Sequence, residues 1–162
     1  MSMQNIIVLV EPEIPYNTGN IARTCVATNT ALHLVRPLGF ELSDKHLKRA
    51  GLDYWPQVQL TLWDNFEKFQ EVLETLVREG YCPIYATTKA GQDYGKVDVS
   101  DRPAVLIFGK ETAGLPEDFL FAHPERCYRI PMYREQRSLN LSNAEAILLY
   151  EVLRQQGFPG LH

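Results

Sequence analysis

Short apolar runs alternate along the chain with longer stretches in which apolar residues recur every three or four positions. The short runs are typical of strands that are buried on both faces of a sheet. They lie at residues 6–10, 31–35, 58–62, 81–86, 104–108 and 127–130. The longer stretches predict helices at residues 17–28, 43–50, 66–76 and 142–156. Strands that alternate with helices in this way predict an α/β fold with a mostly parallel sheet.

All four predicted helices carry candidate capping residues, and for residues 43–50 the candidate is Ser43. Asp64 is followed three residues later by Glu67, and Ser142 by Glu145, which is the spacing of a capping box. At the first helix, Asn17 is a candidate cap. We expect these side chains to fix the residues at which the helices begin.

The length and composition predict one globular domain that spans residues 1–162. The chain has 45% hydrophobic and 22% charged residues, close to the average of globular proteins. Its net charge is −4, from 16 Lys and Arg against 20 Asp and Glu. This balance disfavours indiscriminate binding of nucleic acid. It leaves a local basic patch open, because phosphate contacts depend on where the charges lie.

The three cysteines, Cys25, Cys82 and Cys127, lie far apart, each within or beside an apolar stretch. No C-x-x-C pair and no H-x-x-x-H spacing occurs, so we expect buried free thiols in a reducing cytosol and no metal site. Residues 1–15 lack the basic segment and the long apolar run of a signal peptide or a membrane span. We therefore expect a cytoplasmic protein without membrane contact.

Polar and glycine-containing segments follow several of the predicted strands. Neither a G-x-G-x-x-G pattern after the first strand nor a Walker pattern occurs. Residues 17–23 (NTGNIAR) open the first helix, with Arg23 one turn beyond Gly19 on the same face. This segment fits a ligand-binding surface, and it also fits a plain capped helix with a solvated arginine.

Residues 107–116 (IFGKETAGLP) combine the end of a predicted strand with two glycines. Free backbone N–H groups in such a turn can hold an anion or an adenosine-like ligand at the carboxyl edge of the sheet. Glu111 favours ribose hydroxyls or a cationic ligand over a phosphate group.

The segment at residues 129–151 places hydroxyl and amide side chains (SLNLSN) between a strand and the last helix. That helix is apolar nearly all round, so it needs cover on two sides. One side carries Ala144, Ile147, Leu148 and Val152, and the other carries Ala146, Leu149, Tyr150 and Leu153. A two-fold dimer would supply the second cover, and a helix fully buried within a monomer is the alternative.

These segments, in this order, resemble the SPOUT superfamily of S-adenosylmethionine-dependent RNA methyltransferases, and in particular its TrmL type, also called YibK-like. The resemblance is carried by residues 11–23, 34–55, 107–116 and 129–151. It implies a mostly parallel sheet with helices on both faces and a C-terminal trefoil knot, an exception to the usual absence of threaded chains. It also implies that the methyl donor binds among three knot loops.

Carried over by position, the resemblance assigns residues to two roles, and an RNA substrate adds a set of candidate contacts from the polar and basic residues of the chain. The implied contacts to S-adenosylmethionine are Ala86, Gly109, Glu111, Gly114, Ile130, Met132, Ser138 and Leu139. The implied catalytic pair is Arg23 and Tyr150, with Tyr150 acting across the dimer interface, although it also fits a plain core or interface aromatic residue. The candidate substrate contacts are Asn17, Lys48, Arg49, Arg137 and Asn140, beside Lys45 and Arg134. Each of these cations also fits an ordinary solvated surface.

The activity implied by the resemblance is 2′-O-methylation of the wobble cytidine or uridine of leucine tRNAs by a homodimer. A guanidinium group stays protonated, so we expect Arg23 to grip a phosphate and stabilise the developing alkoxide rather than act as a base. Two alternatives stay open at this point. One is methylation of ribosomal RNA by the same fold, and the other is a non-catalytic RNA-binding protein.

Overall fold

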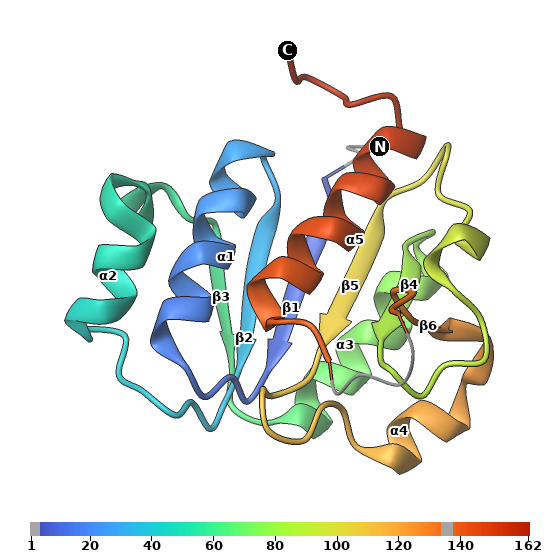
Figure 1. Ribbon diagram of the computed structural model, residues 1–162, viewed down its shortest axis with the longest axis horizontal. Helices are drawn as coiled ribbons and strands as arrows, with labels where there is room; N and C mark the ends of the chain where they lie inside the picture. The colour runs from blue at the N-terminus through green and yellow to red at the C-terminus, as the bar shows by residue number, and fades with distance from the viewer. Residues whose placement is uncertain (1–3, 134–137) are drawn as a thin grey trace.

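Six strands form one parallel sheet at the centre of the computed structural model, which describes residues 4–133 and 138–162 (Figure 1). Every pair of neighbouring strands in this sheet is parallel. The strands are β1 (Ile6–Val10), β2 (Ala31–Val35), β3 (Leu60–Trp63), β4 (Cys82–Ala86), β5 (Ala104–Phe108) and β6 (Cys127–Tyr128). Their order across the sheet is β3-β2-β1-β5-β4-β6. The predicted fold class and the place of each predicted strand are confirmed.

The central strands β1 and β5 are buried along their whole length. Successive side chains of a strand point to opposite faces, so each strand contributes to two hydrophobic clusters. One cluster contains Ile7, Leu9, Leu106 and Phe108, and the other contains Ile6, Val8, Val105 and Ile107. This burial on both faces explains why both strands are continuous apolar runs.

Helices cover both faces of the sheet (Figure 1). The structure contains α1 (Pro15–Ala27), α2 (Lys45–Gly51), α3 (Phe66–Arg78), α4 (Glu117–Ala122) and α5 (Leu141–Gln155), with 3-10 segments η1 (Leu52–Gln57), η2 (Tyr94–Lys96) and η3 (Pro124–Arg126). The helices α1 and α5 contribute to the first cluster, and α3 and α4 to the second. The short helix α2 and η1 pack against α1.

The predicted capping residues of α3 and α5 are wrong. The cap of α3 is Asn65, whose side chain accepts a hydrogen bond from the backbone N–H of Lys68 over 2.9 Å. The cap of α5 is Asn140, whose Oδ1 accepts from the N–H groups of Ser142 and Asn143. In each case an asparagine stands in the extended or polyproline-like conformation directly before the helix, so it takes the role that the sequence pattern gave to a neighbour.

The helix α1 begins at Pro15, two residues earlier than predicted. Proline suits the first helical turn, because it lacks an N–H group that would have no partner there. Asn17 therefore lies inside the helix, and Ile14 at the cap position offers no side-chain acceptor. The acceptor comes instead from a distant segment, described below.

All three cysteines are free and buried, as predicted. Within residues 4–133 and 138–162, no helix is long and apolar enough to cross a membrane. The same residues contain no group of three or more His, Cys, Asp and Glu side chains that could hold a metal ion. The trefoil knot stays a prediction.

Candidate functional site

A cavity of about 540 Å³ lies where β4, β5 and β6 end. Its walls come from the segments that follow these strands and from the start of α5. Ligands of open α/β folds bind at this carboxyl edge of the sheet. The volume is within the range of small-molecule and cofactor sites.

All eight residues that the resemblance assigns to the methyl donor line this one cavity. They are Ala86, Gly109, Glu111, Gly114, Ile130, Met132, Ser138 and Leu139. The candidate substrate residues Asn17 and Asn140 line it as well. The structure thus brings together residues from five separate segments of the chain, while their contacts to a ligand stay predictions.

The loop after β5 can form only with glycine at two positions. A Cβ atom on Gly109 would lie 2.0 Å from the carbonyl carbon of Gly114, far inside van der Waals contact. Gly114 has a φ of +71°, in the left-handed region that favours glycine. Its N–H donates to the carbonyl of Lys110 over 2.8 Å, which closes the turn. The backbone of this loop, rather than its side chains, therefore forms a wall of the cavity beside Gly109.

Glu111 supplies the acceptor that the start of α1 lacks. Its Oε1 accepts from the N–H of Glu13 over 2.8 Å, and its Oε2 accepts from the N–H of Ile14 and from Asn17 Nδ2 over 3.0 and 3.1 Å. A carboxylate offers about four acceptor sites, and three are used here. Contact of the remaining acceptor site with ribose hydroxyls or a cation stays a prediction. The main partner of this carboxylate is the positive end of α1.

A reciprocal contact joins the same two segments. Glu13 accepts hydrogen bonds from both the N–H and the hydroxyl of Thr112, each over 2.9 Å. The backbone hydrogen bond is the largest cause that lowers the pKa of Glu13, followed by the hydroxyl bond. Sequence reasoning missed Glu13, because its partner is 99 residues away.

Asn17 and Asn140 extend this network to α5. Asn140 Nδ2 donates to Asn17 Oδ1 over 3.2 Å, while Asn140 Oδ1 caps α5. Since both ends of the Asn17 amide are engaged by Glu111 and Asn140, its contacts in the structure organise the cavity wall. Direct contact of these two amides with a substrate stays a prediction.

Arg23 and Tyr150 do not line the cavity. Arg23 is exposed on α1, and its guanidinium carbon lies 5.7 Å from the centre of the Tyr54 ring. Tyr150 is 45% exposed on α5, beside Ile147, which is 38% exposed. Within the part of the chain that the structure describes, no hydrogen bond joins Arg23 and Tyr150.

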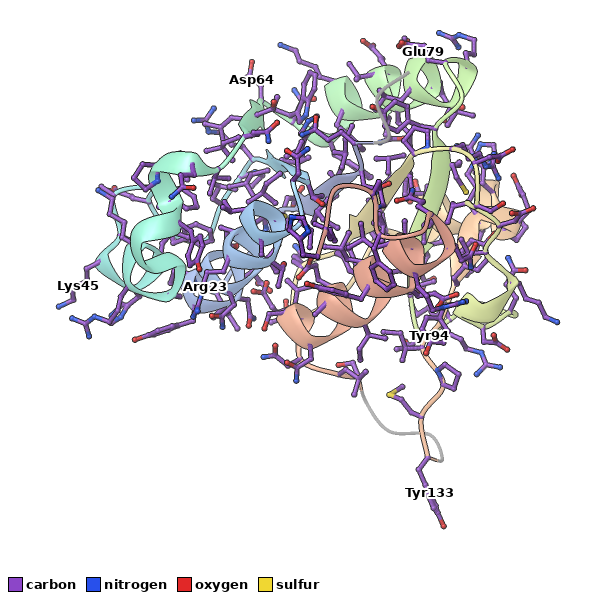
Figure 2. All side chains as sticks on the ribbon, turned by 90° about the horizontal axis from the view of Figure 1, so that it is seen from above. Arg23, Lys45, Asp64, Glu79, Tyr94 and Tyr133 are labelled. Carbon is purple, nitrogen blue, oxygen red and sulfur yellow. The ribbon has the colours of Figure 1, made fainter. Side chains whose placement is uncertain are left out.

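The cations of α2 are exposed, as a surface for RNA requires. Lys45, Lys48 and Arg49 all point to solvent, and Figure 2 shows Arg23 and Lys45 at the same end of the molecule. Arg134 and Arg137 lie outside the described residues, so their contact with RNA stays a prediction.

The apolar sides of α5 differ from the prediction. Leu149 is fully buried within the chain, so a partner cannot cover it, and Leu148 and Leu153 are buried as well. The side left open carries Ile147 and Tyr150. Each predicted side therefore contains buried residues. The exposed stripe consists of Ile147 from one side and Tyr150 from the other.

Glu145 is a second group whose role the sequence pattern missed. It is fully buried between α5 and α1, and its oxygens lie 2.8 and 2.9 Å from Thr24 Oγ1. Burial raises its pKa to about 8, and the hydrogen bond from Thr24 opposes this shift in part. At pH 7, below this pKa, the neutral form predominates, and the contact of Glu145 with Thr24 replaces the predicted capping contact.

A parallel α/β sheet with a loop-lined cavity at its carboxyl edge defines a ligand-binding enzyme fold, and comparison with known proteins identifies the class. The chain belongs to the SpoU rRNA Methylase family, whose model matches residues 4–150. This membership confirms the resemblance to RNA methyltransferases of the SPOUT superfamily.

Individual relatives refine the class. A protein of Listeria innocua, provisionally named a tRNA (cytidine(34)-2′-O)-methyltransferase, is 52% identical over 162 residues, covering 98% of this chain and 92% of its own. A solved structure described as "Structural insights into the 2-OH methylation of C/U34 on tRNA" is 42% identical, with a TM-score of 0.87 and coverage of 96% of this chain and 97% of that chain. An AdoMet-bound rRNA methyltransferase from Sinorhizobium meliloti is 26% identical, with a TM-score of 0.82, covering 95% of this chain and 57% of that chain.

Proposed function

We propose that this protein is an S-adenosylmethionine-dependent tRNA methyltransferase that modifies the 2′-hydroxyl of nucleotide 34. The observation that carries this proposal is the single cavity that unites all eight predicted donor contacts. The relatives described above, which are named for methylation at position 34 of tRNA, support the substrate.

The residues of the cavity fit the proposed donor. Glycine at position 109 lets the backbone of Gly114 and Leu115 pack directly against it, which fixes the shape of the loop that lines the cavity. Leu115, Ile130 and Leu139 supply apolar surface, and the backbone of the glycine loop supplies polar groups. The residues proposed to hold the donor are the eight named above. When bound, S-adenosylmethionine supplies an electrophilic methyl group on its sulfonium sulfur.

In the proposed reaction the ribose 2′-oxygen forms a bond to the methyl carbon as the bond from that carbon to sulfur breaks. The hydroxyl proton leaves to solvent, because Arg23 stays protonated and cannot accept it. Arg23 binds the adjacent phosphate and stabilises the negative charge that develops on the 2′-oxygen. Positioning of the two reactants accounts for most of the acceleration.

We further propose that the working form is a homodimer. Arg23 and Tyr150 lie outside the cavity of their own chain, and α5 exposes Ile147 beside Tyr150. A two-fold partner packed on this stripe would cover the apolar residues and bring these side chains toward a second cavity. The domain itself spans residues 1–162, and the tRNA substrate favours a cytoplasmic location.

The finer substrate assignment is an anticodon stem–loop of leucine tRNAs with cytidine or uridine at position 34. The exposed cations of α2 would contact its phosphates. Selectivity would come from loop shape and splayed bases rather than from bulk charge, since the net charge is −4.

Transfer of labelled methyl groups to a panel of tRNAs and to ribosomal RNA tests the proposal. We expect label in leucine tRNAs, located by nuclease digestion and mass spectrometry on the ribose of nucleotide 34. Label only in ribosomal RNA, or none in any RNA at millimolar donor, would overturn it. The Arg23→Ala variant should bind the donor as the wild type does and transfer no methyl group.

A further inference from the structure

The guanidinium group of Arg23 lies over the ring of Tyr54. Tyr54 belongs to η1, which packs against α1, and its side chain is 37% exposed. The guanidinium carbon lies 5.7 Å from the ring centre, which is within the range of a cation–π interaction. The pair therefore lies at the surface, accessible to a large ligand.

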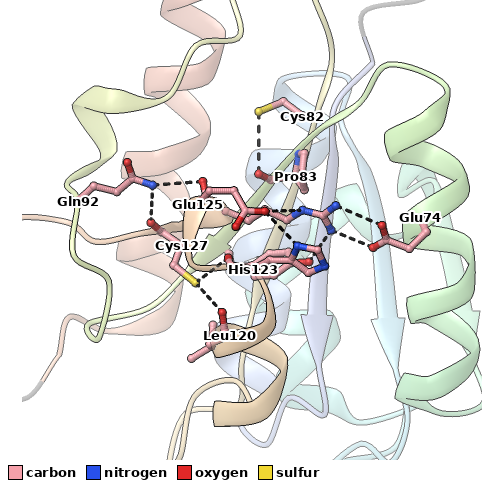
Figure 3. Close-up of polar contacts among 10 residues, drawn as sticks. Glu74, Cys82, Pro83, Gln92, Leu120, His123, Glu125 and Cys127 are labelled. Atoms are coloured by element: carbon pink, nitrogen blue, oxygen red, sulfur yellow. Dashed lines mark hydrogen bonds and ion pairs between the residues drawn. The ribbon is translucent and has the colours of Figure 1, made fainter.

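A second arginine of the fold, Arg126, also lies over a tyrosine ring, with its guanidinium carbon 5.8 Å from the centre of the Tyr85 ring, but its N–H donors are occupied as well. Arg126 is bound through its N–H groups, by both carboxylate oxygens of Glu74 at 2.9 and 3.2 Å and by the Tyr85 hydroxyl at 2.9 Å. Figure 3 shows the two dashed lines from Glu74 to this guanidinium. Such an arginine has few donors left for a ligand.

The donors of Arg23, by contrast, are not consumed. Within the described residues, Arg23 makes no hydrogen bond and no ion pair, and its contact with the Tyr54 ring consumes none of its N–H donors. A guanidinium carries five N–H donors along its edge. An aromatic ring can restrain the plane while all five stay available, which no carboxylate partner could do.

We propose that Tyr54 is a positioning residue for methyl transfer, whose ring orients Arg23 and leaves its N–H donors to bind the RNA. This inference rests on the role proposed above for Arg23. It adds a residue from a separate element, so the geometry of the pair depends on the packing of η1 on α1. Cation–π attraction strengthens when the pair is desolvated. The contact with Tyr54 therefore offsets part of the free energy needed to remove water from the charged guanidinium as RNA covers the site.

Three variants test the proposal. Tyr54→Phe keeps the ring, Tyr54→Leu removes it, and Phe121→Leu is the matched control, since Phe121 is a 63% exposed aromatic residue on α4. We expect Tyr54→Leu to lower kcat for tRNA methylation by about 2- to 30-fold, the range spanned by exposed and desolvated cation–π pairs. Donor affinity by calorimetry should not change. Tyr54→Phe and Phe121→Leu should keep the activity of the wild type.

A double-mutant cycle separates positioning from a merely structural role. Because Tyr54 acts through the charge of Arg23, adding Tyr54→Leu to Arg23→Gln, which carries no charge for the ring to attract, should cost much less than it costs in the wild type. Equal costs in both backgrounds would overturn the proposal, and so would a Tyr54→Phe variant as slow as Tyr54→Leu. If Tyr54→Leu is fully active while Arg23→Ala is inactive, the role of Tyr54 is refuted and the role of Arg23 stands. Full activity of Arg23→Ala refutes the role proposed for Arg23 itself.

Discussion

The substitution Glu145→Gln should remove a pH dependence of stability that arises from one buried carboxyl group. Glu145 is fully buried, and its partner is the Thr24 hydroxyl. The same hydroxyl lies 2.9 Å from the carbonyl of Ile21. A hydroxyl has one proton to donate, so Thr24 cannot donate to Glu145 and to the Ile21 carbonyl at once, and a protonated Glu145 relieves this competition because it carries a proton of its own.

The magnitude follows from the pKa of Glu145, which burial raises from 4.5 to about 8 in the folded protein. Between these two values the folded state holds a proton that the unfolded state has released. The free energy of unfolding therefore falls as pH rises through this window, by roughly 3–5 kcal/mol in total, and does not change further above it. Cys25, the titratable neighbour of Glu145 on α1, has a pKa well above its ordinary value and stays neutral here.

Urea unfolding, followed by tryptophan fluorescence at pH values from 5 to 8.5, measures this effect. The wild type should lose stability across the series relative to Glu145→Gln, whose amide stays neutral. The matched control is Glu151→Gln on the same helix, where hydrogen bonding to Arg154 lowers the pKa of the carboxyl. That variant should differ from the wild type by a constant amount over this range. Parallel profiles for the wild type and Glu145→Gln would show that Glu145 is not held neutral.

Three further substitutions test the cavity and the proposed interface. Gly109→Ala places a Cβ atom 2.0 Å from Gly114, so donor affinity by calorimetry should fall at least about 100-fold; unchanged affinity would mean that this loop does not bind the donor. Glu111→Ala removes the acceptor at the start of α1 and should lower the free energy of unfolding in urea by about 1–3 kcal/mol; a loss below 0.5 kcal/mol, roughly the scale of an ordinary surface change, would show that the cap contributes little. Ile147→Glu places a charge on the exposed stripe of α5 and should yield monomers in sedimentation velocity; a sedimentation profile identical to that of a wild-type dimer would place the interface elsewhere.

The strands could be predicted from the sequence because burial on both faces leaves a continuous apolar run, as in β1 and β5. The capping residues could not, because capping depends on the backbone conformation at one position. Asp64 and Asn65 are adjacent and both can cap, but only Asn65 lies directly before the first residue of α3. For Glu145 the capping-box spacing was misleading, since its partner is 121 residues away.

The sequence predicts which residues line the candidate site, but not the contacts that these residues make with one another. Loops that follow parallel strands meet at one edge of the sheet, so segments that resemble a known family can be expected to converge there. The resemblance could assign Glu111 to the cavity, but its bonds to Glu13, Ile14 and Asn17 depend on how two distant loops fold together. The shape of the loop at Gly109 likewise became clear only from its close approach to Gly114.

The hydrogen bonds of Glu111 couple the binding of the two proposed ligands, S-adenosylmethionine and tRNA. One carboxylate forms part of the cavity wall and also fixes the first turn of α1, the helix that carries Arg23 eight residues further on. A donor molecule that shifts the loop at Glu111 must change the free energy of that first turn, and RNA bound at Arg23 must act on the loop in return. By thermodynamic reciprocity the two effects are equal in size. If the donor tightens tRNA binding by some factor, tRNA must tighten donor binding by the same factor.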